Sequence, residues 1–263
     1  MSLRHTIKSH TPWPLHYIYR KIYYAPQDVP AALGFIFHST KTPTTFGQRL
    51  GLVAKFYKIS YFVDCPHTEH ELIVISRAIL NLVVPGAIVE AGAFHGGSTA
   101  KLSLVARLAG RRFEVFDSFE GMPENTESHG KSIYGREHHF PKGSHAVGLD
   151  EVRGNVERYG DPSRTQYHKG FFSDTMPGWA AKAGKNSVAC ACINVDLVQS
   201  TKDCLINLYP LVPPGGVIYS QDAHFPWIIE LLRDDRFWND ELHMKKPAMR
   251  GLGVSKFVEI IPK

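Results

Sequence analysis

The residues best suited to chemistry stand in one glycine-rich segment, Val89-Glu90-Ala91-Gly92-Ala93-Phe94-His95-Gly96-Gly97-Ser98. Glycines that follow a strand let the backbone approach a ligand closely, and the next helix offers unpaired N–H groups at its start. The dinucleotide fingerprint G-x-G-x-x-G is absent, and the carboxylate of Glu90 would repel a pyrophosphate. Glu90 favours a ligand with an ammonium group, such as S-adenosylmethionine (SAM). A tight turn with an incidental carboxylate would have the same pattern.

A second carboxylate, Asp117, ends the next predicted strand. An acidic side chain at this position can bind both hydroxyl groups of a ribose, as it does in nucleotide-binding Rossmann domains. The simpler interpretation of Asp117 is a cap for the turn that begins at Ser118. Glu90 and Asp117 together predict SAM as the cofactor.

Strands and helices that could position these carboxylates alternate along most of the chain. The predicted strands are Ala87–Glu90, Phe113–Phe116, Gln166–His168, Val188–Val195, Val217–Ser220 and Lys256–Ile261. The predicted helices between them are Ser98–Leu108, Gly148–Arg158, Thr201–Leu211 and one that contains Trp227–Leu232. This alternation predicts an α/β fold with a doubly wound, mostly parallel sheet and helices on both faces.

Two segments lie outside this alternation. Residues 1–64 are predicted to form a helical extension, broken at Pro26, Pro30 and Pro43, ahead of a catalytic domain over residues 65–263. The capping box formed by Thr68 and Glu71 predicts the first helix of that domain. Residues 124–148 are polar and rich in His and Gly, which predicts a mobile lid or a binding loop.

Charge and composition exclude several classes of protein. The chain has 30 basic and 25 acidic residues, a net charge of +5, and no run of five like charges, so we expect no nucleic-acid partner. The sequence contains no run of 18 apolar residues, so we expect no membrane span. Four cysteines without a C-x-x-C pair, and a start without a signal-peptide core, predict a soluble, cytoplasmic protein. The aromatic N-terminal segment is a candidate for packing against a partner subunit in a homo-oligomer.

Three later segments resemble one family. Asp117-Ser118-Phe119-Glu120-Gly121-Met122-Pro123 resembles the D-S-F-E-G-L-P signature of the macrocin O-methyltransferase family, which methylates sugar hydroxyls on natural products. Residues 170–177 are similar to its G-x-F-x-D-T-L-P, and residues 145–160 to the helix before its third strand. The resemblance covers Thr68 to Asp222 and implies a Rossmann-like class I methyltransferase fold.

The resemblance also implies a set of cofactor-binding residues. Glu90, Gly92 and their neighbours would hold the methionine end of SAM, Asp117 and Ser118 the ribose, and residues 171–173 the adenine. The full set is Thr68, Glu90, Ala91, Gly92, His95, Ser98, Thr99, Asp117, Ser118, Gly170, Phe171, Phe172, Ser173 and Asp196. An aromatic side chain beside a planar base gains stacking, although one of the two phenylalanines could simply be core.

Methyl transfer to an alcohol requires help in removing a proton, because an alcohol is a weaker acid than tyrosine. The resemblance implies a divalent metal held by acids after the fourth and fifth strands, where Asp196 and Asp222 stand. The side-chain oxygen of Gln221 could add a ligand to Mg²⁺. The chain departs from the family pattern at Asn194 and Gln221, where the family has acids, so the predicted metal site has less negative charge.

Three alternatives stay open at this point. One is a metal-free methyltransferase in which Asp196 and Asp222 bond the acceptor and His224 or His95 is the general base. The second is a nucleotide-dependent oxidoreductase, which Glu90 disfavours. The third is a SAM- or carbohydrate-binding protein without catalysis, for which Asn194 and Gln221 are the only indications.

Overall fold

The computed structural model describes residues 13–262, which contain one seven-stranded sheet in the order β3-β2-β1-β4-β5-β7-β6. Five strands pair in parallel: β1 (Ala87–Ala91), β2 (Phe113–Asp117), β3 (Thr165–Lys169), β4 (Val188–Ile193) and β5 (Val217–Ser220). β7 (Val258–Ile261) is antiparallel and lies between β5 and β6 (Ala248–Arg250). The strand order reverses between β1 and β4, so a ligand crevice is expected at the carboxyl ends of these strands.

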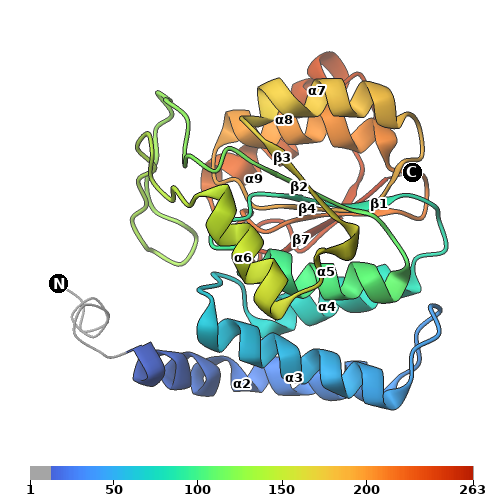
Figure 1. Ribbon diagram of the computed structural model, residues 1–263. Coiled ribbons are helices and arrows are strands. Elements are labelled where there is room, and N and C mark those ends of the chain that lie inside the picture. The colour runs from blue at the N-terminus through green and yellow to red at the C-terminus, as the bar shows by residue number, and fades with distance from the viewer. Residues whose placement is uncertain (1–12, 263) are drawn as a thin grey trace.

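Helices cover both faces of the sheet (Figure 1). α4 (Glu69–Asn81), α5 (Gly97–Ala109) and α6 (Leu149–Tyr159) lie on one face, and α7 (Phe172–Ala183), α8 (Val198–Leu208) and α9 (Pro226–Arg233) on the other. Successive strand residues alternate between the two cores: Ile88 packs with the first group of helices and Val89 with the second. This period of two explains why the central strands are apolar on both faces.

Two N-terminal helices, α2 (Trp13–Phe37) and α3 (Phe46–Phe62), form an outer layer beneath α4 and α5 (Figure 1). The predicted helix breaks at Pro26 and Pro30 are wrong, because α2 continues through both. Both prolines are exposed, so water can bond the carbonyl groups that they leave unpaired. The opposite face of α2 packs against α4, and the contacts there include a hydrogen bond that His70 N donates to Asp28 Oδ1 (2.8 Å). Pro43 lies between the two helices, as predicted.

The remaining elements match the predicted alternation with a few differences. Thr68 caps α4 through the predicted capping box with Glu71. α7 and β6 were not predicted, and α8 begins at Val198, three residues before the predicted start. Short turns complete the chain: η1 (Pro162–Arg164), η2 (Tyr209–Leu211) and the π-helical η3 (Phe237–Glu241).

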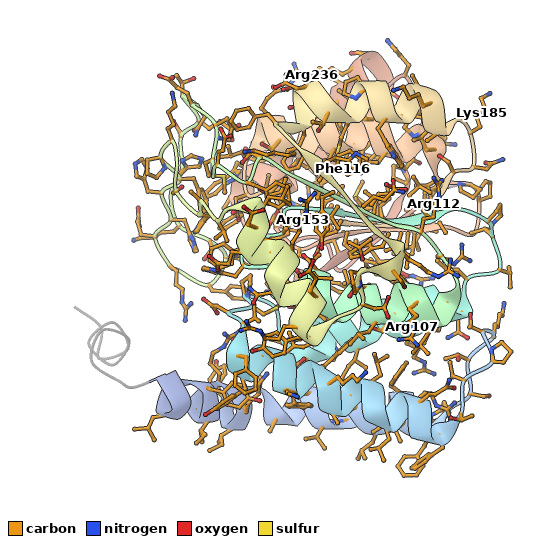
Figure 2. All side chains as sticks on the ribbon, in the orientation of Figure 1. Arg107, Arg112, Phe116, Arg153, Lys185 and Arg236 are labelled. Atoms are coloured by element: carbon orange, nitrogen blue, oxygen red, sulfur yellow. The ribbon has the colours of Figure 1, made fainter. Side chains whose placement is uncertain are left out.

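The side chains divide as expected for a globular α/β protein. Phe116 is buried in the sheet, whereas the basic residues labelled in Figure 2 are all exposed: Arg107, Arg112, Arg153, Lys185 and Arg236. All four cysteines are free and buried. Among the described residues, no helix combines the length and apolar character that crossing a membrane requires.

Candidate active site

The glycine-rich loop after β1 is tightly packed against the end of β4. Gly92 has φ of 91°, and a Cβ built there would lie 2.0 Å from Asn194 O, so only glycine fits. The loop is fixed to both neighbouring strands, since Gly92 N donates to Phe116 O (2.9 Å) and Asn194 N donates to Ala91 O (3.0 Å). α5 then begins at Gly97 without a side-chain cap, which leaves its first N–H groups free for a ligand.

Glu90 is a buried carboxylate near the end of β1. Its side chain is 3% exposed, and its Oε2 has no hydrogen-bond partner among the described residues. Burial raises the pKa of Glu90 to about 7, while the hydroxyl groups of Ser98 and Thr99 lower it. An unpaired buried carboxylate is costly, and the ammonium group of SAM would satisfy this one.

Asp117, at the end of β2, joins two loops of the site. Its Oδ2 accepts from Ala93 N and its Oδ1 accepts from Phe119 N, both at 2.7 Å. Burial raises the pKa of Asp117, and these backbone N–H groups lower it. Ser118 is also buried, and its hydroxyl donates to Gly121 O (2.8 Å). Asp117 is therefore fixed at the end of β2, beside the glycine-rich loop that follows β1.

The predicted adenine-binding segment lies beside Asp117. Gly170 N donates to Asp117 O (3.0 Å), which places the end of β3 next to the end of β2. Phe171 precedes α7 and Phe172 begins it; Phe172 packs partly against the core beneath, and Ser173 is exposed. Phe172 therefore contacts the core, and the role of Phe171 beside an adenine stays a prediction.

Asp196 and Asp222 meet at the ends of β4 and β5. Asp222 is buried, and its Oδ2 accepts from Val195 N (2.6 Å) and Asp196 N (3.0 Å). Its Oδ1 is buried and has no partner among the described residues. Burial raises the pKa of both carboxyl groups, and the charge of Asp222 raises that of Asp196 further. We call the pair the acidic centre: Asp222 Oδ1 is buried without a partner among the described residues, and Asp196 Oδ2 lies 3.9 Å from His145 Nδ1.

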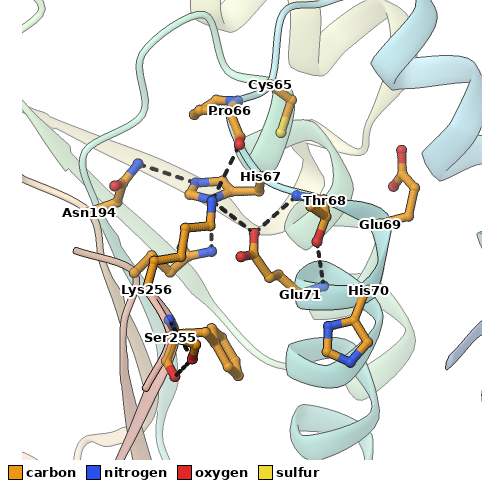
Figure 3. A network of polar contacts seen from close by, with 12 residues as sticks. Cys65, Pro66, His67, Thr68, Glu69, His70, Glu71, Asn194, Ser255 and Lys256 are labelled. Atoms are coloured by element: carbon orange, nitrogen blue, oxygen red, sulfur yellow. Dashed lines mark hydrogen bonds and ion pairs between the residues drawn. The ribbon is translucent and has the colours of Figure 1, made fainter. Parts of the chain in front are cut away.

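His67 bonds both polar residues at which the chain departs from the family pattern. The Asn194 amide nitrogen lies 3.2 Å from its Nε2, and the Gln221 amide nitrogen 2.8 Å from its Nδ1. Figure 3 shows His67, Glu71, Asn194 and Lys256 pointing toward one another. The His67 ring is 3% exposed, and burial lowers its pKa to about 4, so the imidazole is uncharged at neutral pH.

Lys256 brings a positive charge to the same place from the segment between β6 and β7. Its Nζ lies 3.1 Å from Glu71 Oε2 and donates to Pro66 O (3.3 Å). Its backbone oxygen accepts from Ala223 N (3.1 Å), next to Asp222. The charge of Lys256 lowers the pKa of both Asp196 and Asp222, against the larger effect of burial.

These contacts do not fit the predicted Mg²⁺ site. Over residues 13–262, no group of three or more His, Cys, Asp or Glu side chains is arranged to hold a metal ion. Asp196 and Asp222 supply two carboxylates, and the Nε2 of Gln221 is engaged with His67, which leaves its Oε1 as the one uncharged oxygen that this side chain offers. Mg²⁺ requires a near-octahedral shell of oxygens, usually with carboxylates. Here two acids lie under the influence of an ammonium group instead.

The two histidines considered as bases lie in different surroundings. Burial, together with the charge of Lys256, lowers the pKa of His224 to about 3, and its buried Nδ1 has no partner among the described residues. The Nδ1 of His95 lies 2.5 Å from Glu151 Oε1 on α6. His95 lines a cavity of about 370 Å³ whose lining contains neither aspartate of the acidic centre. His224 is therefore near that centre, and His95 is paired elsewhere.

Residues 124–148 cover the carboxyl edge of the sheet without a helix or regular strand; only the bridge between Lys131 and Glu137 occurs there. Hydrogen bonds hold this segment (light green in Figure 1) to the residues that follow Asp196 and to those that follow Asp222. The Glu127 carboxylate accepts from Val198 N (2.7 Å) and Gln199 N (2.9 Å), and Ile133 N donates to His224 O (2.9 Å). Its position is that of a lid, and its motion stays a prediction.

The chain has the fold of a class I methyltransferase, and its family match makes it a SAM-dependent methyltransferase. The family model described as macrocin-O-methyltransferase (TylF) matches residues 70–240. The chain therefore belongs to the macrocin O-methyltransferase family, and the predicted fold class and family are confirmed.

Two curated relatives and one solved structure illustrate this membership. The chain is 37% identical over 185 residues to 8-demethyl-8-(2,3-dimethoxy-alpha-L-rhamnosyl)-tetracenomycin-C 4'-O-methyltransferase of Streptomyces olivaceus (65% of this chain, 67% of the relative). It is 30% identical over 172 residues to demethyldecarbamoylnovobiocin O-methyltransferase of Streptomyces niveus (60% of this chain, 64% of that protein). The O-methyltransferase NovP shares the fold, with a TM-score of 0.58 and 24% identity over 73% of this chain and 79% of that one.

Two residues of the site were not expected from the sequence. His67 directly precedes the capping residue Thr68, and Lys256 precedes the closing strand. Neither stands in a motif that indicates chemistry. The available signal was indirect: Asn194 and Gln221 stand where the family has acids, and this pointed to a change at the site without naming His67 or Lys256.

Proposed function

We propose that this protein transfers the methyl group of SAM to a hydroxyl group of a sugar or another hydroxylated small molecule. The names of the curated relatives support this acceptor class, since the Streptomyces olivaceus enzyme is named for a rhamnosyl tetracenomycin. The observation that carries the proposal is the free, buried Oδ1 of Asp222 at the carboxyl edge where Glu90 and Asp117 also lie. An acceptor hydroxyl would donate to that oxygen.

The cofactor would lie across the ends of β1 and β2. Glu90 would bind the ammonium group, and the first N–H groups of α5 the carboxylate. Asp117 would bind the ribose hydroxyls through its remaining lone pairs, and Phe171 would border the adenine. Thr68 and Ser118 would contribute indirectly. Thr68 caps α4, and Ser118 Oγ accepts from Glu120 N in the loop after β2.

The acidic centre would perform the proton transfer. As the bond between sulfur and the methyl carbon breaks, the acceptor oxygen forms its bond to that carbon and loses its proton to the carboxylate pair. Asp222 is held by two backbone N–H groups, so its free oxygen is aimed without reorganisation. Asp196 would accept a second hydrogen bond from the acceptor molecule, next to the one accepted by Asp222. A histidine base is less suitable, because burial makes His224 a weak proton acceptor.

A turnover assay with SAM and a panel of glycosides tests this function, with S-adenosylhomocysteine (SAH) as the measured product. Calorimetry with SAM, SAH and NAD⁺ is run on the same protein. We expect SAM and SAH to bind, NAD⁺ not to bind, and at least one glycoside to be methylated. Binding of NAD⁺ without binding of SAM would indicate the oxidoreductase. Binding of SAM without any methylated product would indicate the non-catalytic alternative.

Two further expectations accompany this proposal. We infer a cytoplasmic reaction, because four free buried cysteines suit a reducing compartment. We also infer a homo-oligomer, because apolar side chains such as Ile22 and Phe37 are 70% and 67% exposed along α2. No nucleic acid or membrane takes part in this scheme.

A further inference from the structure

Two fully buried side chains of opposite charge join the starts of α4 and α5. Glu69 is the first residue of α4, Lys101 lies near the start of α5, and both side chains are 0% exposed. Lys101 Nζ donates to Glu69 Oε2 (2.8 Å) and to the hydroxyl group of Ser60 on α3 (2.6 Å), which donates to Glu69 Oε1 (2.6 Å). Breaking a buried ion pair is costly, because it leaves one charge without a partner. The starts of α4 and α5 are therefore held together.

The outermost helix, α2, supplies two neighbouring cations to the same region. Lys21 Nζ lies 2.6 Å from Glu69 Oε1, so each oxygen of that carboxylate is paired with an ammonium group. Arg20 donates to Cys65 O (2.9 Å) and lies 3.7 Å from Asp64 Oδ1. α2 therefore holds both the first residue of α4 and the segment that leads into that helix.

The segment that Arg20 holds lies directly against the first residue of α5. A Cβ built on Gly97 would lie 2.9 Å from Asp64 O and 2.8 Å from Cys65 Cβ, so this contact requires glycine. The first N–H groups of α5 have no side-chain cap. Their position depends on the backbone contact at Gly97 and on the ion pair of Lys101, and residues of α2 support both.

In the proposed function, the start of α5 binds the methionine part of SAM. The Oε2 atom of Glu90 is buried without a partner among the described residues, and the ammonium group would bind there. The carboxylate would bind the first N–H groups of the helix. Because several N–H groups of a helix start bind one carboxylate together, a small displacement of the helix weakens all of these hydrogen bonds.

We propose that the outer layer of α2 and α3 completes the cofactor site, with Arg20, Lys21 and Lys101 as positioning residues that hold the start of α5 for the carboxylate of SAM. None of the three touches the cofactor. Lys21 and Lys101 act through Glu69, and Arg20 acts through the backbone of residues 64–65. This inference rests on the proposed function for the cofactor and its orientation.

The test compares two ligands that differ in the methionine part. One is SAH, and the other is 5′-methylthioadenosine, which has a methyl group on sulfur in place of the amino-acid chain. Calorimetry measures both affinities for the wild-type protein, Arg20→Met and Lys101→Met. We expect each variant to bind SAH about tenfold more weakly and to bind 5′-methylthioadenosine as the wild type does. A merely structural role would change both affinities or neither.

Three further variants serve as controls. Lys202→Met removes a lysine that pairs with Glu241 on the other face of the sheet, and it should leave both affinities unchanged. Leu104→Ala removes a buried side chain further along α5, so it should lower the melting temperature without changing the ratio of the two affinities. Asp117→Ala should weaken both ligands, because both contain the ribose.

The possible outcomes separate this inference from the proposed function. If the wild-type protein binds neither ligand, the proposed function fails and the inference fails with it. If it binds both ligands equally well, or if the two variants lose affinity for both ligands in parallel or for neither, the inference alone is overturned. Loss of 5′-methylthioadenosine binding by Lys101→Met together with a lowered melting temperature would show that this variant is misfolded, and Arg20→Met then decides.

Discussion

The carboxylate of Asp222 holds the backbone of Asp196 in a left-handed conformation. Asp196 has φ of 61°, and its N–H group donates to Asp222 Oδ2. The next constraint is Trp227, whose Nε1 donates to Asp196 O (2.9 Å). A non-glycine residue adopts this conformation at a cost in free energy, so it persists only where neighbouring bonds fix it. The ends of β4 and β5 are therefore one unit, and a change at Asp222 also affects Asp196.

Asp222→Asn should nearly abolish turnover while preserving the fold. The asparagine oxygen can still accept from a backbone N–H group, but the charge that accepts the proton is lost. We expect kcat to fall by at least about 100-fold with unchanged SAH affinity by calorimetry. The matched control is Asp203→Asn on α8, which removes a carboxylate that accepts from the Gln199 side chain (2.8 Å). Comparable kcat in the two variants would remove Asp222 from the chemistry.

Cofactor affinity should depend on pH through Glu90. Its pKa is raised to about 7, so it is neutral below that pH and ionised above it. The ammonium group of SAH binds the ionised form, so affinity should fall as pH decreases below 7, approaching about tenfold per pH unit. Glu90→Gln should bind SAH more weakly and with no such dependence. Calorimetry at several pH values measures both, and parallel pH profiles in the two proteins would argue against this role.

Asp117→Ala should weaken SAM and SAH binding by about 1.5–3 kcal/mol, the usual loss for a charge-assisted hydrogen bond. The substitution also frees the N–H groups of Ala93 and Phe119, so the melting temperature is measured alongside the affinity. Asp161→Ala is the control for loss of a carboxylate that caps a turn, since Asp161 accepts from Ser163 N outside the site. An intact fold with unchanged SAH affinity would exclude Asp117 from the ribose site.

The cofactor half of the site was predictable because it depends on local order along the chain. Glu90 and Asp117 stand at the carboxyl ends of two strands, and the carboxyl ends of adjacent parallel strands must meet at one edge of the sheet. The glycine pattern at Gly92 predicted a close approach to a ligand, which stays a prediction; the structure shows in addition that Gly92 packs against Asn194 O. The fold class followed from the same alternation of strands and helices.

The acidic centre was predictable only in part. Asp196 and Asp222 were expected together, but His67 lies 154 positions from Gln221 and Lys256 lies 190 positions from Pro66. No periodicity or motif links residues that are so far apart. Pro26 was misjudged for a related reason: local propensity disfavours a helix there, and tertiary packing of α2 overrides it.

The exposed apolar side chains of α2 should form a subunit interface. Ile18 and Ile22 are 50% and 70% exposed, and Leu33 and Phe37 continue the same helix. We expect light scattering to give the mass of a homo-oligomer, and Ile22→Glu to reduce it, because a charge in an apolar contact is costly. Val83→Glu, at a site 74% exposed between α4 and β1, should leave the mass unchanged. A monomeric mass for the wild-type protein would contradict the interface.

The lid formed by residues 124–148 should close more firmly when cofactor and acceptor are bound. It is tied down by Glu127, whose carboxylate accepts from the first N–H groups of α8, immediately after Asp196 and Leu197. Lys131 and Lys142 offer trypsin sites within it. We expect bound SAH and acceptor to slow tryptic cleavage there, because lids of this kind order around their ligands.

The variant Glu127→Ala should speed cleavage of the lid in the ligand-free protein and lower kcat, since the lid would lose its anchor beside the acidic centre. Glu124→Ala is the matched control: Glu124 is 81% exposed and pairs only with Lys142, so its removal should change little. Cleavage is followed by mass spectrometry of the fragments over time. Equal cleavage rates in the wild type and in Glu127→Ala, with and without ligands, would mean that this segment is a fixed wall of the site and not a lid.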